Sequence, residues 1–321
     1  YLFLLEWLLK YLINFMDKDY FKKLRILDGG MGQDLLERGL VTKGTLWSSS
    51  ALLEEKNHKL IIDSHLSFIN AGAEVICTNS FTSRRVRFIQ NKVNEHFEYA
   101  NKKAGELALE AKKISKKNIL VAGSLPAQND TYCVDKRDQN IIKKNFYDQA
   151  NLIAPYIDFF YLDVLSSGKE IEIALNVIEK FNKPVLVGLH LKKNCKLPSG
   201  ETITEIVEKF NNNNWLGVIS ACVSPEIVDE SANELKSLNI PFGFKVNLWG
   251  VEEPLPVDEF NTAKPNEIGT NPNIRLGTRK DITDEIFKNF VAKIIKKGAT
   301  ILGGCCEVKT NHIKQIKKLI N

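Results

Sequence analysis

The chain has no run of the ~20 consecutive apolar residues that a membrane-spanning helix needs. Its most apolar segment, residues 1–16, is interrupted by Glu6 and Lys10. That segment also lacks the basic start and the small-residue cleavage site of a signal peptide. We therefore predict no membrane span and interpret residues 1–23 as an N-terminal extension with a natural start at Met16. A peripheral helix packed on the fold or on a membrane surface is the alternative.

The chain also lacks a large excess of one charge sign. The 44 Lys and Arg stand against 39 Asp and Glu, and the excess is spread over predicted helical faces such as residues 102–103 and 112–113. A nucleic-acid-binding surface would gather basic and aromatic side chains on one face, so we expect no nucleic-acid partner. Six cysteines in a chain of 321 residues do not form a disulfide framework. They favour a reducing, cytoplasmic location, with some of the cysteines serving in metal binding or as nucleophiles.

No segment rich in Pro, Gly or Ser divides the chain into two domains. Instead, short β-branched runs alternate with amphipathic segments, which is typical of parallel strands joined by helices. Eight runs are predicted as strands, at residues 24–28, 74–79, 119–124, 159–164, 185–191, 217–222, 242–247 and 300–305. The pattern predicts a single-domain (β/α)8 TIM barrel over residues 24–321. An open doubly wound sheet is the alternative, but residues 28–33 read DGGMGQ and lack the dinucleotide-binding Gly-x-Gly-x-x-Gly spacing.

Two segments of the last third are predicted in more detail. A helix is expected over residues 282–297, with an apolar stripe formed by Ile286, Phe290, Ile294 and Ile295. Residues 248–281 carry four prolines and form the longest irregular stretch. They follow the seventh predicted strand, so we expect this stretch to lie over the barrel mouth and to be functional or mobile.

Side chains capable of chemistry end six of the predicted strands, and barrel enzymes use that rim for their active sites. They are Asp28, Asn79, Asp163, Cys222, Asn247 and the pair Cys305 and Cys306. Three thiolates from two strands can bind a zinc ion (Zn2+) and leave the fourth position open for water or substrate. Cys77, Cys133 and Cys195 each stand alone and are interpreted as small buried apolar residues.

Several motifs between residue 26 and the C-terminus resemble the homocysteine S-methyltransferase family. The chain reads LDGGMG at 27–32, LWS at 46–48, AGAE at 71–74, TNSF at 78–81, AGSLP at 122–126 and GGCC at 303–306, and Cys222 precedes Ser-Pro at 224–225. The GGCC motif is the most specific of these. The family includes enzymes that use betaine, S-methylmethionine or S-adenosylmethionine, and a domain of cobalamin-dependent methionine synthase.

The resemblance implies a zinc-dependent methyltransferase. Cys222, Cys305 and Cys306 would bind zinc, and the homocysteine thiol would occupy the fourth position as a thiolate. The thiolate would take a methyl group from an onium donor, which could be betaine, S-methylmethionine, S-adenosylmethionine or a dimethylsulfonium compound. The product would be methionine, which places the chain in methionine biosynthesis.

The resemblance also implies a set of substrate contacts. Asp28 and the backbone of Gly29 and Gly30 would hold the amino acid part of homocysteine, and Asp163 would face its ammonium group. The aromatic side chains of Trp47 and Phe81 would form walls around the onium methyl group. Asn79 and Asn247 complete the predicted substrate site. The plainer interpretations are a turn cap for Asp28 and loop packing for the two aromatic residues.

Three positions depart from the family pattern. Ala221 stands where Asn is usual, Asp163-Val164 replaces Glu-Thr, and Lys245-Val246-Asn247 replaces Tyr-Pro-Asn. The alternatives are therefore another small thiol or selenol as the acceptor, a non-catalytic zinc-binding or thiol-binding barrel, or a lyase with Lys245 as a Schiff base. The methyl donor and the choice between monomer and homo-oligomer stay open at this point.

Overall fold

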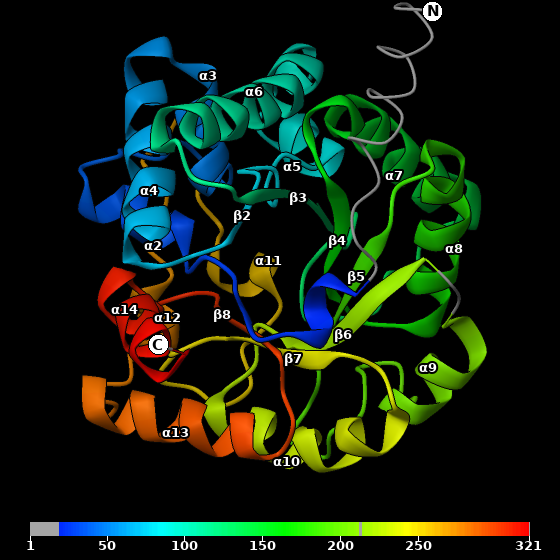
Figure 1. Ribbon diagram of the computed structural model, residues 1–321. Coiled ribbons are helices and arrows are strands. Elements are labelled where there is room, and N and C mark those ends of the chain that lie inside the picture. The colour runs from blue at the N-terminus through cyan, green and yellow to red at the C-terminus, as the bar shows by residue number, and fades with distance from the viewer. Residues whose placement is uncertain (1–18, 212–213, 321) are drawn as a thin grey trace, which may run out of the picture.

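Eight parallel strands form the centre of the molecule in the computed structural model, which describes residues 19–211 and 214–320 (Figure 1). Their order is β1-β8-β7-β6-β5-β4-β3-β2. Their bounds are β1 Arg25–Ile26, β2 Val75–Cys77, β3 Leu120–Pro126, β4 Phe159–Leu165, β5 Val185–Leu189, β6 Trp215–Ala221, β7 Phe242–Val246 and β8 Ile301–Gly304. All eight predicted strands are therefore confirmed, with differences at their ends.

The sheet closes on itself between its two outer strands. A parallel bridge joins Leu27 to Val75, the Glu74 N–H donates to the Ile26 carbonyl at 2.8 Å, and the Asp28 N–H donates to the Val75 carbonyl at 3.0 Å. The predicted (β/α)8 barrel is thus confirmed. Because every strand is parallel, the carboxyl ends of all of them meet at one rim.

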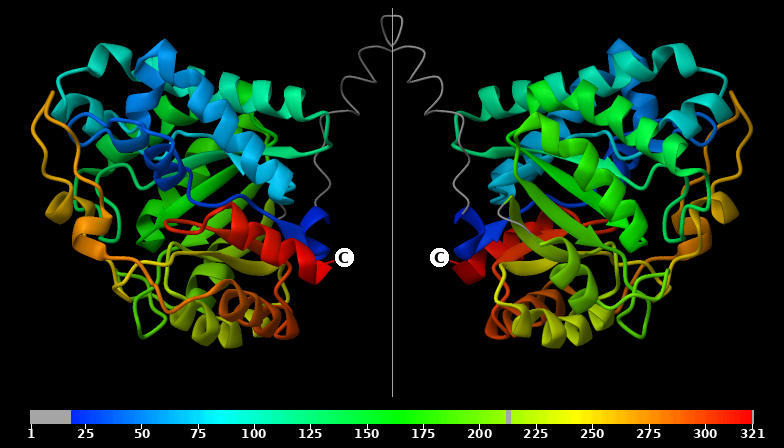
Figure 2. Two further views of the ribbon diagram at one scale, coloured as in Figure 1. Left: turned by 90° about the vertical axis from the view of Figure 1, so that its left-hand side faces the viewer. Right: turned by 90° about the vertical axis from the view of Figure 1, so that its right-hand side faces the viewer.

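Helices cover the outside of the barrel (Figures 1 and 2). Their bounds are α2 Met31–Glu37, α3 Ser50–Leu53, α4 His58–Ala71, α5 Arg85–Gln90, α6 Phe97–Ser115, α7 Gln139–Ile153, α8 Gly168–Ile178, α9 Ile203–Phe210, α10 Pro225–Leu235, α11 Val257–Phe260, α12 Asn273–Leu276, α13 Asp284–Lys296 and α14 Thr310–Ile320. Single-turn 3-10 helices lie at residues 20–22, 47–49, 55–57, 94–96, 154–156, 179–181 and 236–238. Among the residues with described structure, no helix is long and apolar enough to cross a membrane. The predicted features of residues 1–16 lie outside the described part.

The local sequence explains where several of these helices begin. Ser224 accepts a hydrogen bond from the Ile227 N–H, and Pro225 occupies the first helical position of α10. Thr202 and Glu205 form a capping box at the start of α9. The caps fix the direction in which the chain leaves the strand rim, and Ser224 does so two residues after Cys222.

The predicted stripe of α13 is wrong at one position. Ile286 is 47% exposed, whereas Phe287, Val291 and Ile294 are buried. Apolar residues occupy two adjacent stripes of this helix, and periodicity alone does not choose between them. The Phe287 ring lies 4.8 Å from the His312 ring of α14, so packing against α14 selects the stripe one residue further along.

The segment 248–281 lies along the end of the molecule opposite to the chain's C-terminus (Figure 2, yellow to orange). It contains the two short helices α11 and α12. The Leu248 N–H donates to the Cys306 carbonyl at 3.0 Å, and Val257 and Phe260 line the cavity described below. The predicted position over the barrel mouth is therefore confirmed.

Candidate active site at the strand rim

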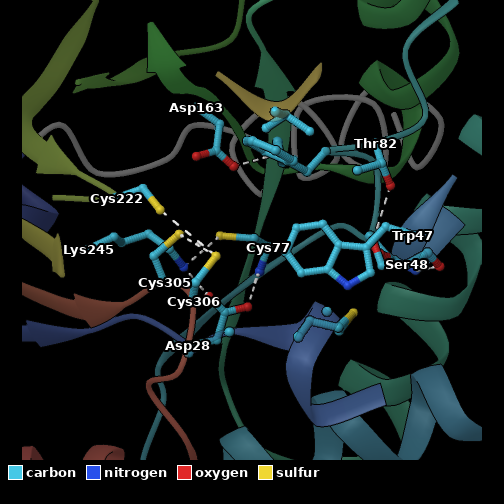
Figure 3. Close-up of a pocket in the computed structure, with 18 of the residues that line it drawn as sticks. Asp28, Trp47, Ser48, Cys77, Thr82, Asp163, Cys222, Lys245, Cys305 and Cys306 are labelled. Carbon is cyan, nitrogen blue, oxygen red and sulfur yellow. Dashed lines mark hydrogen bonds and ion pairs between the residues drawn. The ribbon is translucent and has the colours of Figure 1, made fainter. Parts of the chain in front are cut away.

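A cavity of about 860 Å³, counting the space at its open mouth, lies at the carboxyl ends of the strands. Seven of the strand ends contribute to its wall through Asp28, Cys77, Ser124, Asp163, Cys222, Lys245 and Cys305. Figure 3 labels all of these residues except Ser124 and shows their side chains converging from different strands. The cavity is thus formed at the rim where barrel enzymes carry out their chemistry.

Three cysteine side chains point toward one another at one side of this cavity (Figure 3). The Sγ atom of Cys306 lies 3.9 Å from the Sγ atoms of both Cys222 and Cys305, and all three lie within 4.8 Å of one another. Sulfur ligands of a tetrahedral zinc ion, with bonds of about 2.3 Å, lie about 3.8 Å apart. The spacing of the three thiols therefore fits one zinc ion.

The backbone places these sulfur atoms with two unusual features. Cys222 follows β6 in the left-handed region at φ 52°, which turns the chain toward the cavity. Gly30 allows the loop after β8 to approach closely, because a Cβ atom there would lie 2.5 Å from the Cys305 carbonyl oxygen. The Cys305 N–H in turn donates to the Val246 carbonyl of β7 at 2.7 Å.

The three thiols differ in acidity. Burial raises the pKa of Cys222, but hydrogen bonds with Cys305, Cys306 and the Tyr132 hydroxyl outweigh it, and the pKa falls well below its usual value. Hydrogen bonding with the Cys222 sulfur raises the pKa of the Cys305 and Cys306 thiols. One proton is therefore lost most easily at Cys222, which gives the cluster the anionic character that a cation needs.

Tyr132 and His190 support the cluster and were not predicted from the sequence. The Tyr132 hydroxyl lies 3.2 Å from the Cys222 Sγ atom, and the Tyr132 ring lies 4.7 Å from the His190 ring. Tyr132 comes from the loop after β3 and His190 directly follows β5. A polar residue after the fifth strand was a usable signal for His190, whereas the position of Tyr132 in a loop gave none.

Asp28 forms a buried ion pair that the sequence did not predict. Its Oδ1 atom lies 2.6 Å from the Lys245 Nζ atom, and its Oδ2 atom accepts a hydrogen bond from the Cys77 N–H at 2.7 Å. Burial opposes the charge on Lys245, but the nearby Asp28, Cys77 and Asp163 raise its pKa above the usual value. A lysine held in its charged form is a poor Schiff-base nucleophile, which disfavours the lyase alternative.

Cys77 packs against the apolar core, as predicted, but it does not stand apart from the cavity. Its Sγ atom lies 3.6 Å from the Lys245 Nζ atom, and the residue lines the cavity. The sequence did not indicate this contact, because a cysteine inside an apolar strand is usually a small core residue. Cys133 and Cys195 do not line the cavity.

Asp163 is the second carboxylate of the cavity. Its Oδ2 atom accepts a hydrogen bond from the Ser124 hydroxyl at 2.6 Å. Burial raises the pKa of Asp163 to about 6, although Lys245 and the Ser124 hydroxyl act in the opposite direction. The carboxylate is therefore ionised at neutral pH and is close to the range in which it takes up a proton.

Trp47, Phe81 and Asn79 come from the loops after the first two strands, and all line the cavity. Trp47 has φ 43°, and the absence of a side chain at Gly32 makes room for its ring, since a Cβ atom there would lie 2.9 Å from Trp47 Cε2. The Asn79 side-chain amide donates to the Ser48 carbonyl at 3.1 Å. Asn79 therefore braces the turn that carries Trp47.

The other predicted substrate residues have contacts within the protein. The Asn247 side-chain amide donates to the Cys222 carbonyl at 2.7 Å, and Asn247 is fully buried and does not line the cavity. It holds the turn that carries Cys222. Gly29 and Gly30 line the cavity, and the Gly30 N–H donates to the Val308 carbonyl at 2.9 Å.

Comparison with known proteins identifies the family. The homocysteine S-methyltransferase family matches residues 25–320 of the chain. The chain belongs to this family. Its membership makes the protein a methyltransferase enzyme and confirms the family predicted from the GGCC motif and the motifs around the first strands.

Individual relatives agree over nearly the whole length. Homocysteine S-methyltransferase 1 of Arabidopsis thaliana is 23% identical and the alignment covers 91% of this chain and 92% of that protein. The selenocysteine methyltransferase of Astragalus bisulcatus is also 23% identical, over 92% of each chain. The oxidized form of the Escherichia coli homocysteine methyltransferase MmuM has the same fold, with a TM-score of 0.75, 19% identity, and 92% of this chain and 96% of that chain covered. A metallated form of that protein matches with a TM-score of 0.73, at 17% identity over the same shares of the two chains.

Proposed function

We propose that this enzyme uses one zinc ion, held by Cys222, Cys305 and Cys306, to transfer a methyl group from an onium donor to the thiol of homocysteine. The observation that carries the proposal is the cluster of three sulfur atoms within 4.8 Å of one another, beside a cavity. Three sulfur ligands leave one position of a tetrahedral ion for a substrate sulfur. When bound, zinc would lower the pKa of that thiol, so that the thiolate exists near neutral pH.

The reaction then needs the two substrates to be aligned. The thiolate sulfur forms a bond to the methyl carbon while the bond between that carbon and the onium atom breaks, and the electron pair stays on the donor. The onium atom of the donor loses its positive charge in this step, and homocysteine becomes methionine. The protein's own part is to hold the two reactants in line and to exclude water.

Asp163 is the best placed carboxylate for the ammonium group of homocysteine. The alternative, Asp28, is already paired with the Lys245 ammonium at 2.6 Å. Asp163 lines the same cavity, and in the part of the chain that the structure describes its hydrogen-bond donors are neutral hydroxyls such as that of Ser124. The proposed role of Asp28 is therefore to hold Lys245 and the Cys77 backbone in place around the acceptor site.

The Trp47 and Phe81 rings form the proposed walls for the onium group. Both line the cavity, and the Trp47 ring occupies the space that Gly32 leaves open. A cation over an aromatic ring gains about 0.5–2 kcal/mol, the larger value applying where water is excluded. The aromatic walls thus favour a positively charged donor over its neutral product and help the product to leave.

The test is metal content together with methyl transfer. We expect wild-type protein purified under reducing conditions to hold about one zinc ion per chain, as a three-cysteine site requires. Cys306→Ala should hold less than about a tenth of that amount, because two thiolates rarely retain zinc. It should also form no methionine from homocysteine with betaine, S-methylmethionine, S-adenosylmethionine or dimethylsulfoniopropionate. Cys133→Ala is the matched control and should keep both properties, because Cys133 lies outside the cavity.

Two results would contradict the proposal. Wild-type protein without zinc under reducing conditions would remove the metal site. Bound zinc without methyl transfer to homocysteine, but with transfer to another small thiol or to selenocysteine, would replace the acceptor and leave the zinc site intact. The second outcome is worth testing because one relative is a selenocysteine methyltransferase.

A further inference from the structure

Arg84 is a buried cation in the wall of the cavity that no part of the proposed function uses. Its side chain is 0% exposed, and the residue lines the cavity beside Phe81, with the guanidinium carbon 5.5 Å from the Phe81 ring centre. Nη1 donates to the Ala127 carbonyl at 3.0 Å and to the Thr131 hydroxyl at 3.2 Å. Nε and Nη2 have no hydrogen-bond partner among the described residues. Unpartnered buried donors on a charged group are costly, so a missing acceptor is expected.

The neighbouring Arg87 shows what Arg84 lacks. Arg87 lies one helical turn further on and is also buried, but it pairs with Asp130 at 3.1 Å and with Asp258 at 2.5 Å. Those two carboxylates are occupied by Arg87, whereas the hydrogen-bond acceptors of Arg84 are neutral oxygen atoms. Asp130 and Asp258 also act on the Arg84 charge, but among the described residues neither carboxylate forms a hydrogen bond or ion pair with it. A buried charge without a directly paired anion is rare unless a ligand supplies one.

Two further donors of the cavity wall lack acceptors. The indole N–H groups of Trp47 and Trp249 are buried, and neither has a partner among residues 19–211 and 214–320. Both residues line the same cavity as Arg84. A cavity lined by a guanidinium and by two N–H groups without acceptors fits a ligand group that only accepts hydrogen bonds, and a carboxylate is such a group.

The acidic residues of the cavity indicate which other charged groups that ligand can carry. In the described part of the chain, the carboxylates in the cavity wall are Asp28 and Asp163. Lys245 neutralises Asp28, and Asp163 is assigned to the ammonium group of homocysteine. A second amino acid in the cavity would bring a second ammonium group without a carboxylate to face it.

We propose that Arg84 binds the carboxylate of the methyl donor, and that the donor is an onium carboxylate without an ammonium group. Betaine and dimethylsulfoniopropionate have this chemistry, whereas S-methylmethionine and S-adenosylmethionine carry the additional ammonium. The inference rests on the proposed methyl transfer, since the donor is defined by that reaction. It assigns a specificity-determining role to a residue that touches the donor at the end away from the transferred methyl group.

The experiment compares sulfonium donors that differ in the carboxylate, on zinc-loaded enzyme. We expect Arg84→Gln to raise KM for dimethylsulfoniopropionate by about 10- to 100-fold, the usual loss for a hydrogen-bonded charge pair. KM for trimethylsulfonium, which has no carboxylate, and KM for homocysteine should stay within about twofold, the usual scatter of a neutral change. Arg85→Gln is the matched control, because Arg85 pairs with Asp148 and does not line the cavity. Betaine is tested beside these donors, and S-methylmethionine should have a lower kcat/KM than the better of the two onium carboxylates.

Binding separates this proposal from the proposed function. Calorimetric titration of dimethylsulfoniopropionate and of trimethylsulfonium, with methionine filling the acceptor site, needs no turnover. Carboxylate-dependent binding that Arg84→Gln weakens at least tenfold supports the role of Arg84 even when every assay of methyl transfer fails. If Arg84→Gln weakened the binding of both sulfonium compounds equally, the role of Arg84 would be merely structural and the proposal would be overturned. A preference for S-methylmethionine over both onium carboxylates would overturn the donor class.

A conservative variant covers the case in which Arg84→Gln does not fold. Arg84→Lys keeps the charge but replaces the planar guanidinium with a single ammonium group, so it should fold and bind zinc like the wild type. It should raise KM for dimethylsulfoniopropionate by a smaller factor than Arg84→Gln and leave trimethylsulfonium unchanged. An unchanged KM for the carboxylate donor together with a lower melting temperature would contradict the proposal.

Discussion

The buried pair of Asp28 and Lys245 allows a quantitative prediction about stability. The two side chains are 2% and 6% exposed, and their charged atoms lie 2.6 Å apart. Lys245→Met keeps most of the apolar volume of the side chain but leaves the Asp28 carboxylate with the Cys77 N–H as its hydrogen-bond donor. Removal of one partner of a buried pair costs about 3–5 kcal/mol, because the remaining charge stays buried without compensation. We expect a loss of that size in the free energy of unfolding.

The double variant Asp28→Asn and Lys245→Met provides the control. It removes both charges, and the asparagine keeps an oxygen that accepts from the Cys77 N–H. Replacement of a whole buried pair by uncharged residues is often nearly neutral, so most of the lost stability should return. The coupling free energy between the two positions should then be several kcal/mol, well above the value of about 0.5 kcal/mol typical of independent sites.

Urea denaturation followed by tryptophan fluorescence measures these differences, with excess zinc in every sample so that metal loss does not contribute. A chain of this size can unfold through intermediates, so the midpoint and the slope should both be compared. A loss below about 1 kcal/mol in Lys245→Met would refute the reasoning, because it would mean that Asp28 finds other compensation. A double variant as unstable as the single variant would refute it equally.

Two other predictions concern the cavity. Since burial raises the pKa of Asp163 to about 6, a fall in pH below 6 protonates this carboxylate and removes its attraction for the substrate ammonium. We expect kcat/KM for homocysteine to fall about tenfold per pH unit below pH 6. The donor is kept saturating, and the zinc content is checked at each pH. This fall in kcat/KM should be absent in Asp163→Asn. Gly32→Ala should push the Trp47 ring aside, because the new Cβ atom would lie 2.9 Å from Cε2. Its KM for the donor should rise severalfold with KM for homocysteine unchanged; an unchanged donor KM would refute the role of Trp47 as an aromatic wall.

The barrel could be predicted from the sequence because its signals are local and repeated. The alternation of β-branched runs with amphipathic segments marked all eight strands, and parallel strands place their carboxyl ends at one rim whatever the details of packing. The three cysteines followed from that geometry, because Cys222 ends one predicted strand and Cys305 with Cys306 ends another. Their sulfur atoms do meet within 4.8 Å.

The contacts around those cysteines could not be predicted in the same way. The pairing of Lys245 with Asp28 joins residues 217 positions apart in the chain, and its geometry depends on how far two side chains reach across the barrel. The assignment of Asn247 to the substrate site stays a prediction, and nothing in the sequence indicated that its side-chain amide donates to the Cys222 carbonyl. The strand pattern gives the rim to which a residue belongs, whereas the rotamer decides whether the residue lines the cavity or supports a neighbour.

Lys245, one of the departures from the family pattern, changes which charges of the cavity are available to the methyl donor. Lys245 neutralises Asp28, so that Asp163 remains as the carboxylate available to a substrate ammonium, and Arg84 remains as the cation available to a substrate carboxylate. Three thiolates with one zinc ion would carry a single negative charge, which attracts the onium group toward the sulfur. We therefore expect a donor with one positive and one negative end to be held at both ends, by the thiolate cluster and the Trp47 ring at one end and by Arg84, beside Phe81, at the other. A donor with an additional ammonium would have to displace Lys245 from Asp28 or compete with homocysteine for Asp163, and both cost free energy in a buried site. We therefore expect Lys245 and Arg84, which are far apart in the sequence, to act together in selecting the donor.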